Sequence, residues 1–192
     1  KHQIRVSCVA GARPNFIKIS ALVEELRRRP RFESRLIHTG QHFSPEMSAV
    51  FFDELGLPEP DRHLGLGSSV PAGPSDQLAE MMRRIENDLK ETRPDVTIVV
   101  GDVTSTLASA IVCSKLGLPM AHVEAGLRSF DRAMPEEVNR LITDSISDYL
   151  FVSEPSGIEN LKAEGVPAEK VHFVGNVMID TLLRFRGRAE ES

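Results

Sequence analysis

Residues 99–110, "VVGDVTSTLASA", join an apolar run to a helical pattern through a glycine and a single acid, Asp102. The run "VTIVV" at 96–100 is typical of a strand buried on both faces of a sheet. The following "VTSTLASAIVCSKLG" at 103–117 predicts a helix that ends at Gly117. A buried strand leading directly into a helix is the repeating unit of parallel α/β proteins.

The same alternation extends along the chain in both directions. Segments between the apolar runs carry apolar residues at helical spacing, as at Phe16, Ile19 and Val23. The pattern therefore predicts an α/β fold: a Rossmann-like parallel sheet with helices on both faces and right-handed crossovers. Six strands are expected: 4–10, 34–39, 96–100, 119–123, 149–153 and 171–175.

Composition limits the classes of partner. The 192 residues are 41% hydrophobic, which suits one well-buried domain. The net charge of −5 provides no basic field for nucleic acid or an anionic membrane, so a small molecule or another protein is the expected partner. No run approaches the roughly 20 apolar residues that span a bilayer, and no signal peptide is recognisable, so we expect a cytoplasmic protein.

Two cysteines, one segment without clear periodicity and the expected domain bounds complete the outline. Cys8 and Cys113 lack metal-ligand spacing and are interpreted as small buried hydrophobes. Residues 57–75 are rich in Pro, Gly and Ser and predict a long surface loop or flap. Residues 1–174 are expected to form the domain, and 175–192 a hinge or linker helix towards a missing second domain.

Ligands of open parallel sheets bind at the carboxyl ends of the strands. After the first strand, "GARPNFIK" places Arg13 and Lys18 beside a helix start, which indicates either a phosphate site or a glycine turn with two solvated bases. The motif is not G-x-G-x-x-G, so it does not indicate a dinucleotide. After the second strand, Gln41 and His42 fit a hydrogen-bonded loop better than a ligand site.

Carboxylates follow the next two strands. Asp102 alone is better explained as the N-cap of its helix than as a catalytic group. Glu124 follows "PMAHV", where a partly desolvated carboxylate suits proton transfer. Glu136 follows Pro135, a pattern that by itself indicates a helix start with acids in the first turn. Because all three can face one crevice, they favour acid–base chemistry on a phosphorylated or nucleotide-linked substrate.

These motifs resemble a known family. "GARPNFIK", "TGQH", "VVGDVTSTLA", "HVEAGLRSFDRAMPEEVNRLITD", "LFVSEPSGIENLKAEGV" and "VGNVMIDTLL", in this order, resemble the N-terminal half of bacterial, non-hydrolysing UDP-N-acetylglucosamine 2-epimerases. The resemblance covers almost the whole chain, and "HVEAGLRS" followed by "MPEE" is its most specific part. It implies one half of a GT-B-like two-domain fold, with the nucleotide sugar between the domains.

The resemblance also implies a reaction. UDP-GlcNAc and UDP-ManNAc interconvert by elimination of UDP to a 2-acetamidoglucal and re-addition, without cofactor or metal. Asp102, Glu124 and Glu136 correspond to the acid–base carboxylates of the family. Arg13 and Lys18 correspond to residues near the substrate phosphates, and Gln41 and His42 to part of an allosteric UDP-GlcNAc site found in some members.

Two departures and several alternatives stay open. Asn15 stands where many members have Glu, and the stretch between Glu124 and Glu136 is shorter than in many. The chain lacks the family's second domain, so we expect it to be inactive alone and to pair with that domain, with homodimerisation common in the family. A hydrolysing 2-epimerase and a stand-alone binding domain without turnover are the alternative functions.

Overall fold

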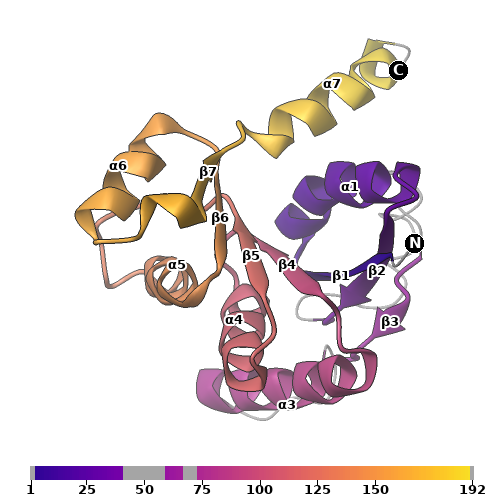
Figure 1. The fold of residues 1–192 in the computed structure, drawn as a ribbon, viewed down its shortest axis with the longest axis horizontal. Coiled ribbons are helices and arrows are strands. Elements are labelled where there is room, and N and C mark those ends of the chain that lie inside the picture. Colours follow the sequence, from indigo (N-terminus) through magenta and orange to yellow (C-terminus); the bar gives the residue numbers. More distant parts are fainter. Residues whose placement is uncertain (1–2, 41–58, 67–72, 191–192) are drawn as a thin grey trace.

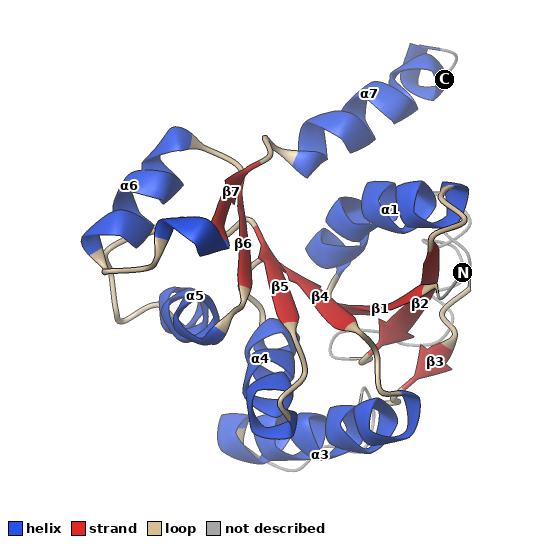
Figure 2. Cartoon of the chain, viewed as in Figure 1, coloured by secondary structure: helices blue, strands red, loops and turns tan. Residues whose placement is uncertain are grey.

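A computed structural model describes residues 3–40, 59–66 and 73–190. Strands and helices alternate along these residues, as Figures 1 and 2 show. The strands are β1 (Ile4–Ala10), β2 (Phe32–His38), β3 (Arg62–His63), β4 (Val96–Val100), β5 (Met120–Val123), β6 (Tyr149–Val152) and β7 (Val171–Phe173). The helices are α1 (Arg13–Arg28), α3 (Pro74–Thr92), α4 (Thr104–Leu116), α5 (Pro135–Ile146), α6 (Pro155–Ala163) and α7 (Val177–Glu190), with a 3-10 turn at Ala168–Lys170.

The strands of the described residues form one seven-stranded sheet in the order β3-β2-β1-β4-β5-β6-β7. Every neighbouring pair is parallel, with Val9 of β1 opposite Ile37 of β2 on one side and Val99 of β4 on the other. The chain builds outward from β1 in both directions, so the strand order reverses between β1 and β4. Such a switch point is where open α/β sheets bind ligands. The predicted Rossmann-like parallel sheet is confirmed.

Helices cover both faces of the sheet. In Figure 1, α1 and α7 lie on one side of it and α3 and α4 on the other. Phe16, Ile19 and Val23 of α1 are buried against β1, as their helical spacing predicts. On the opposite face, α3 buries Met81, Ile85 and Leu89, one turn apart. Helix α4 is buried over most of its surface, consistent with its position between α3, α5 and the sheet.

The predicted strands are correct in number and order apart from β3. That strand has two residues, Arg62 and His63, and lies inside the predicted loop at 57–75. Leu64 and Leu66 are buried in the core beside it, so the prediction of a surface loop is wrong for this part. Two residues are too few to show the alternation that identifies a strand.

Both cysteines are free and buried, as predicted. Burial raises the pKa of the Cys8 thiol to about 12 and that of Cys113 to about 11, so neither is a thiolate at neutral pH. Within the described ranges, no helix has both the length and the apolar character needed to cross a membrane.

Helix α7 follows the last strand and packs by its first turns on α1. Val177 is buried, and the Thr181 hydroxyl donates a hydrogen bond to the Ile17 carbonyl (3.0 Å). Ile179 and Leu182 are exposed on the same helix, and Figure 1 shows its later turns extending away from the sheet.

Candidate active site

The turn after β1 ties α1 to the neighbouring strand β4 at the switch point. Arg13 and Pro14 are the first and second residues of α1. Asn15 accepts a hydrogen bond from the Ala12 N–H (3.2 Å) and donates one to the Val100 carbonyl (2.7 Å). A glutamate at this position would have no N–H to donate to Val100, so this link depends on asparagine.

The structure describes some of the predicted binding residues and not others. Lys18 is half-buried and points towards the end of β5, where it meets a carboxylate. Arg13 is placed at the start of α1, but its side chain is not described. Gln41 and His42 lie outside the described residues.

Asp102 does not cap α4. The N-cap residue is Val103, which makes no side-chain capping bond, so the prediction of a capping role is wrong. The Asp102 carboxylate instead accepts a hydrogen bond from Arg140 Nη1 at 2.6 Å, and Asn139 donates to the Asp102 carbonyl at 2.8 Å. Asp102 stands one position before the cap, and both of its partners belong to α5.

Glu124 follows β5 directly and is only 7% exposed. Its Oε2 lies 2.5 Å from Lys18 Nζ, forming a largely desolvated ion pair between β5 and α1. Its φ of +68° falls in the left-handed region that favours glycine, which costs about 1–3 kcal/mol for a residue with a side chain. The strained turn and the ion pair fix this carboxylate at the carboxyl edge of the sheet.

Asp102 and Glu124 share this edge. The Gly101 N–H donates to the Val123 carbonyl (3.1 Å), which joins the turns after β4 and β5. A Cβ built on Gly101 would lie 3.5 Å from Lys18 Nζ and 3.9 Å from Glu124 Oε2, so the ion pair packs against this glycine. The structure therefore brings together the ends of β1, β4 and β5, as the strand order requires.

The two glutamates of "MPEE" have different environments. Glu136, in the first turn of α5, is exposed at the same edge. Glu137 is buried and accepts hydrogen bonds from the Ser129 N–H (2.9 Å), the Phe130 N–H (3.0 Å) and Arg140 Nη2 (2.8 Å). Burial alone would raise the pKa of Glu137, but these hydrogen bonds outweigh it and lower the pKa to about 2. Glu137 thus holds the loop between β5 and α5.

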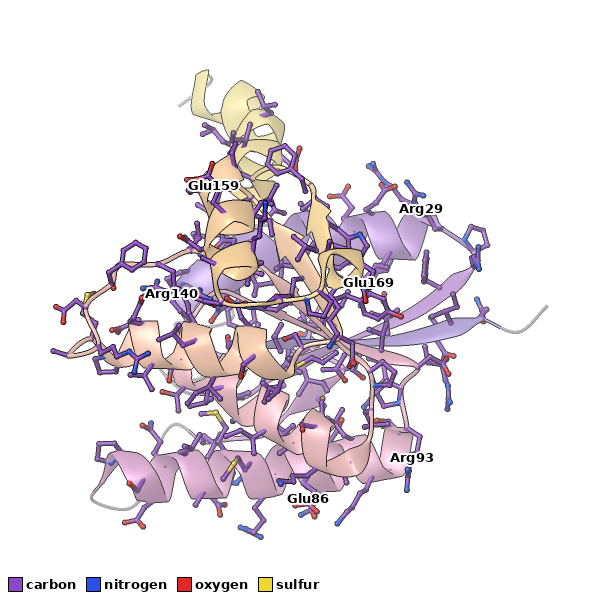
Figure 3. All side chains as sticks on the ribbon, turned by 60° about the vertical axis from the view of Figure 1, so that its left-hand side comes forward. Arg29, Glu86, Arg93, Arg140, Glu159 and Glu169 are labelled. Carbon is purple, nitrogen blue, oxygen red and sulfur yellow. The ribbon has the colours of Figure 1, made fainter. Side chains whose placement is uncertain are left out.

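Sequence reasoning missed Asn139 and Arg140, which organise this edge from α5. Arg140, labelled in Figure 3, joins the buried Glu137 to Asp102. The spacing of Glu137 and Arg140, three residues apart on a helix, predicts contact between them. Nothing in the sequence alone indicated that Arg140 also reaches Asp102, 38 residues away.

The arrangement suits proton transfer beside an anion. Asp102 pairs with Arg140 and Glu124 pairs with Lys18, and each ion pair fixes the position of its carboxylate. Lys18 and Arg140 add positive charge at the switch point. In the part of the chain that the structure covers, no cluster of three or more His, Cys, Asp or Glu could hold a metal ion.

Known proteins resemble this chain over most of its length. Residues 24–192 match the family described as UDP-N-acetylglucosamine 2-epimerase. A "UDP-N-acetylglucosamine 2-epimerase homolog" of Methanococcus maripaludis is 47% identical over 94% of this chain and 49% of its own. A "UDP-2,3-diacetamido-2,3-dideoxy-D-glucuronate 2-epimerase" of Pseudomonas aeruginosa is 42% identical over 97% of this chain and 52% of its own.

Solved structures agree on the fold. The crystal structure of Methanocaldococcus jannaschii UDP-GlcNAc 2-epimerase with UDP-GlcNAc and UDP matches with a TM-score of 0.93 and 42% identity, covering 98% of this chain and 51% of that one. Acinetobacter baumannii MurG, at 9% identity and a TM-score of 0.60, shares the fold alone. The chain spans about half the length of the curated relatives that it matches. Family match, identity and fold agree, and the chain belongs to the UDP-N-acetylglucosamine 2-epimerase family.

Proposed function

We propose that this chain supplies the acid–base carboxylates of an enzyme that interconverts UDP-GlcNAc and UDP-ManNAc, as the N-terminal half of a two-domain protein. A base removes the C2 proton while the bond between C1 and the UDP oxygen breaks, giving 2-acetamidoglucal and UDP. UDP then adds back to C1, and C2 receives a proton on the opposite face. Asp102, Glu124 and Glu136 are the proposed acid–base groups.

One observation carries this proposal: two carboxylates and two cations meet at the switch point of the sheet. The C2 proton has no adjacent carbonyl to acidify it, so positive charge develops on the sugar as the C1–O bond loosens. Carboxylates held in place stabilise that charge, and general bases typically contribute about 10²- to 10⁴-fold. Asp102 and Glu124 are fixed by Arg140 and Lys18 in the manner this requires.

The nucleotide sugar is supported more firmly than its exact identity. The M. jannaschii relative was crystallised with UDP-GlcNAc and UDP, and the P. aeruginosa relative is named for a diacetamido glucuronate sugar. We assign UDP-GlcNAc because relatives named for it predominate among those compared. We assign Arg13 and Lys18 to the anionic end of the substrate, and Gln41 and His42 to a second UDP-GlcNAc site.

We also propose that residues 1–174 form the catalytic domain and that residues 175–192 lead to a second domain. Two features support this boundary. Strand β7 ends at Phe173, and Gly175 has a φ of +79°, which turns the chain out of the sheet before α7. About half of each curated relative lies outside the match, which leaves room for a domain of similar size.

Binding to this edge can be tested with the 192-residue chain itself. Titration of the ¹⁵N-labelled chain with UDP-GlcNAc should shift the backbone amides of Gly101, Asp102 and Ala125 most. The amide of Asp95, at the other end of β4, serves as the internal control. Shifts that gather at the Asp95 edge would place the ligand elsewhere and remove these carboxylates from the catalytic set.

A further inference from the structure

Phe130 is an exposed aromatic residue to which the reaction proposed above gives no role. It lies on the loop between β5 and α5, and it is 79% exposed, more than any other large hydrophobic residue that the structure describes. Removing a phenyl ring from water is favourable, so a ligand that covers this ring would gain binding free energy. Exposure alone assigns no role, however, because single exposed hydrophobic residues are ordinary on protein surfaces.

The backbone of Phe130 is also strained. Its φ is +60°, in the left-handed region that residues with a side chain rarely adopt. Two other non-glycine residues in the described ranges share this feature, Arg93 (φ +46°) and Glu124 (φ +68°). Arg93 is the C-cap of α3, where this conformation is common, and Glu124 is a proposed catalytic carboxylate. Phe130 caps no helix and its ring gains little burial in return, and strain of this kind gathers at functional sites.

Hydrogen bonds hold Phe130 in this conformation. The Phe130 N–H donates to Glu137 Oε1 (3.0 Å), and the Ser129 N–H donates to Glu137 Oε2 (2.9 Å). The Asp131 N–H donates to Ser129 Oγ (3.3 Å), and the Ala133 N–H donates to Asp131 Oδ1 (2.9 Å). The loop therefore presents the ring from a fixed backbone, which reduces the entropy lost when a ligand contacts it.

The same anchor connects Phe130 to Asp102. Glu137 Oε2 accepts a hydrogen bond from Arg140 Nη2 (2.8 Å), and Arg140 Nη1 donates to Asp102 Oδ2 (2.6 Å). One carboxylate and one guanidinium thus separate the Phe130 backbone from a proposed catalytic group. In the proposed reaction the sugar C2 lies against the carboxylates, so the sugar is the part of the substrate nearest to this loop.

We propose that Phe130 is a substrate-contact residue whose ring packs against the sugar of the bound nucleotide sugar. A pyranose ring has faces of C–H groups and its acetamido group carries a methyl, and an aromatic ring can cover either apolar surface. The strain at residue 130 and the anchor on Glu137 then have a common explanation, because together they present the ring at the catalytic edge before the sugar arrives. This inference rests on the proposed function of Asp102.

A tryptophan reporter tests the contact in the 192-residue chain. The chain contains no tryptophan, so Phe130→Trp gives a single indole N–H signal in the ¹⁵N spectrum. Titration with UDP-GlcNAc should shift this signal, whereas UDP should leave it unchanged. Tyr149→Trp is the matched control, since Tyr149 is an exposed aromatic residue (45%) that begins β6 at the opposite edge of the sheet. Its indole should respond to neither ligand.

The same titration distinguishes this inference from the proposed function. If UDP-GlcNAc shifts the amides of Gly101 and Asp102 but not the indole of Phe130→Trp, the sugar contact is wrong and the proposed function stands. An indole that shifts equally with UDP would also reject the sugar contact. Shifts at neither place would reject the proposed function together with this inference.

Substitution by glycine separates ligand contact from stability. Phe130→Gly should raise the melting temperature of the 192-residue chain, because glycine adopts a φ of +60° without strain and the exposed ring contributes little packing. In a full-length epimerase carrying this half, it should raise KM by about 10-fold with little change in kcat, since the lost contact stabilises ground state and transition state alike. Phe130→Tyr retains the ring and should keep a KM close to that of the wild type.

Arg93→Gly is the matched control for the glycine variant. It relieves a similar strain where α3 ends before β4, and Figure 3 shows Arg93 well away from Arg140. It should raise the melting temperature and leave KM unchanged. A lower melting temperature for Phe130→Gly would show that the ring serves the fold, and a raised melting temperature with normal KM would show strain without a ligand contact. Either result would overturn the proposal.

Discussion

Asp102, Glu124 and Glu137 are all held by cations or N–H groups, yet their surroundings suit different tasks. The Glu137 carboxylate is surrounded by hydrogen-bond donors from the loop and from Arg140, so its role is structural. Within the described residues, the Asp102 carboxylate pairs with Arg140, and 31% of the Asp102 side chain is exposed. The exposed part of the Asp102 carboxylate is accessible to a ligand, whereas the donors around Glu137 already occupy its carboxylate.

Asp102→Asn separates chemistry from folding. We expect the free energy of unfolding to fall by no more than about 1 kcal/mol, because the pair with Arg140 is partly exposed and asparagine still accepts a hydrogen bond. Turnover in the full-length enzyme should fall by about 10²- to 10⁴-fold if Asp102 transfers a proton. Urea unfolding and steady-state kinetics measure the two effects, and a stable variant with normal turnover would contradict the catalytic role.

Glu137→Gln should lower the free energy of unfolding at neutral pH. A folded pKa of about 2 against 4.5 corresponds to about 3 kcal/mol of stabilisation at pH 7. Because the folded pKa is the lower one, this stabilisation is complete above pH 4.5 and is lost as the pH falls towards 2. The difference in free energy of unfolding between wild type and Glu137→Gln should therefore narrow over that interval.

Urea unfolding at several pH values measures this narrowing. Glu136→Gln provides the matched control, since Glu136 is exposed in the same helical turn and should change stability little. A constant difference between wild type and Glu137→Gln from pH 7 to pH 3 would show that the hydrogen bonds of Glu137 do not depend on its charge.

At the scale of the elements, the turn between β1 and α1 requires a glycine at position 11. A Cβ on Gly11 would lie 2.4 Å from Ser105 Oγ and 2.5 Å from Thr39 Oγ1, closer than atoms pack. Gly11→Ala should therefore destabilise the protein by about 1–3 kcal/mol through overpacking where β1, β2 and α4 meet.

Gly73→Ala is the control for this substitution, because among the described residues a Cβ there would meet nothing closer than 3.8 Å, and the φ is negative (−140°). It should cost at most about 1 kcal/mol, through the weaker N-cap preference of alanine. Thermal unfolding compares the stability of the two variants. Equal stability would show that the neighbours of Gly11 move enough to accommodate the added methyl group.

The elements also show how far sequence reasoning reaches. Long apolar strands and amphipathic helices such as α3 were predictable because each signal is local. Strand β3 was missed because its two residues carry no period, although Leu64 and Leu66 beside it are core residues. The several roles of α5 were missed for a different reason. The hydrogen-bond partners of its polar residues Asn139, Arg140 and Asp144 lie far away in the sequence, so no local pattern predicts these contacts.

Considered as a whole, the described part of the molecule places Asp102 and Glu124, two of its proposed catalytic groups, at the carboxyl edge of the sheet. Strand order alone places the ends of β1, β4 and β5 together, and this much followed from the predicted parallel sheet. What the sequence did not reveal is the network beneath that edge, in which His122, Asp144 and Arg128 are buried. Such a network depends on tertiary contacts that no local pattern encodes.

The requirements of the proposed reaction lead to a prediction about the 192-residue chain on its own. Elimination of UDP requires the leaving group to be held in line with the proton that departs, and the relatives have a further half of similar length. Enclosing a substrate between two domains excludes water and fixes the reacting groups, which can contribute about 7–11 kcal/mol. We therefore expect the chain to fold, to bind UDP-GlcNAc weakly, and to show no epimerisation when the sugar C1 and C2 protons are followed by NMR. The second half of a full-length relative, supplied as a separate chain, should restore part of the activity where the interface re-forms. Robust turnover by the purified 192-residue chain would contradict this account, because the carboxylates at the ends of β4 and β5 would then suffice without enclosure.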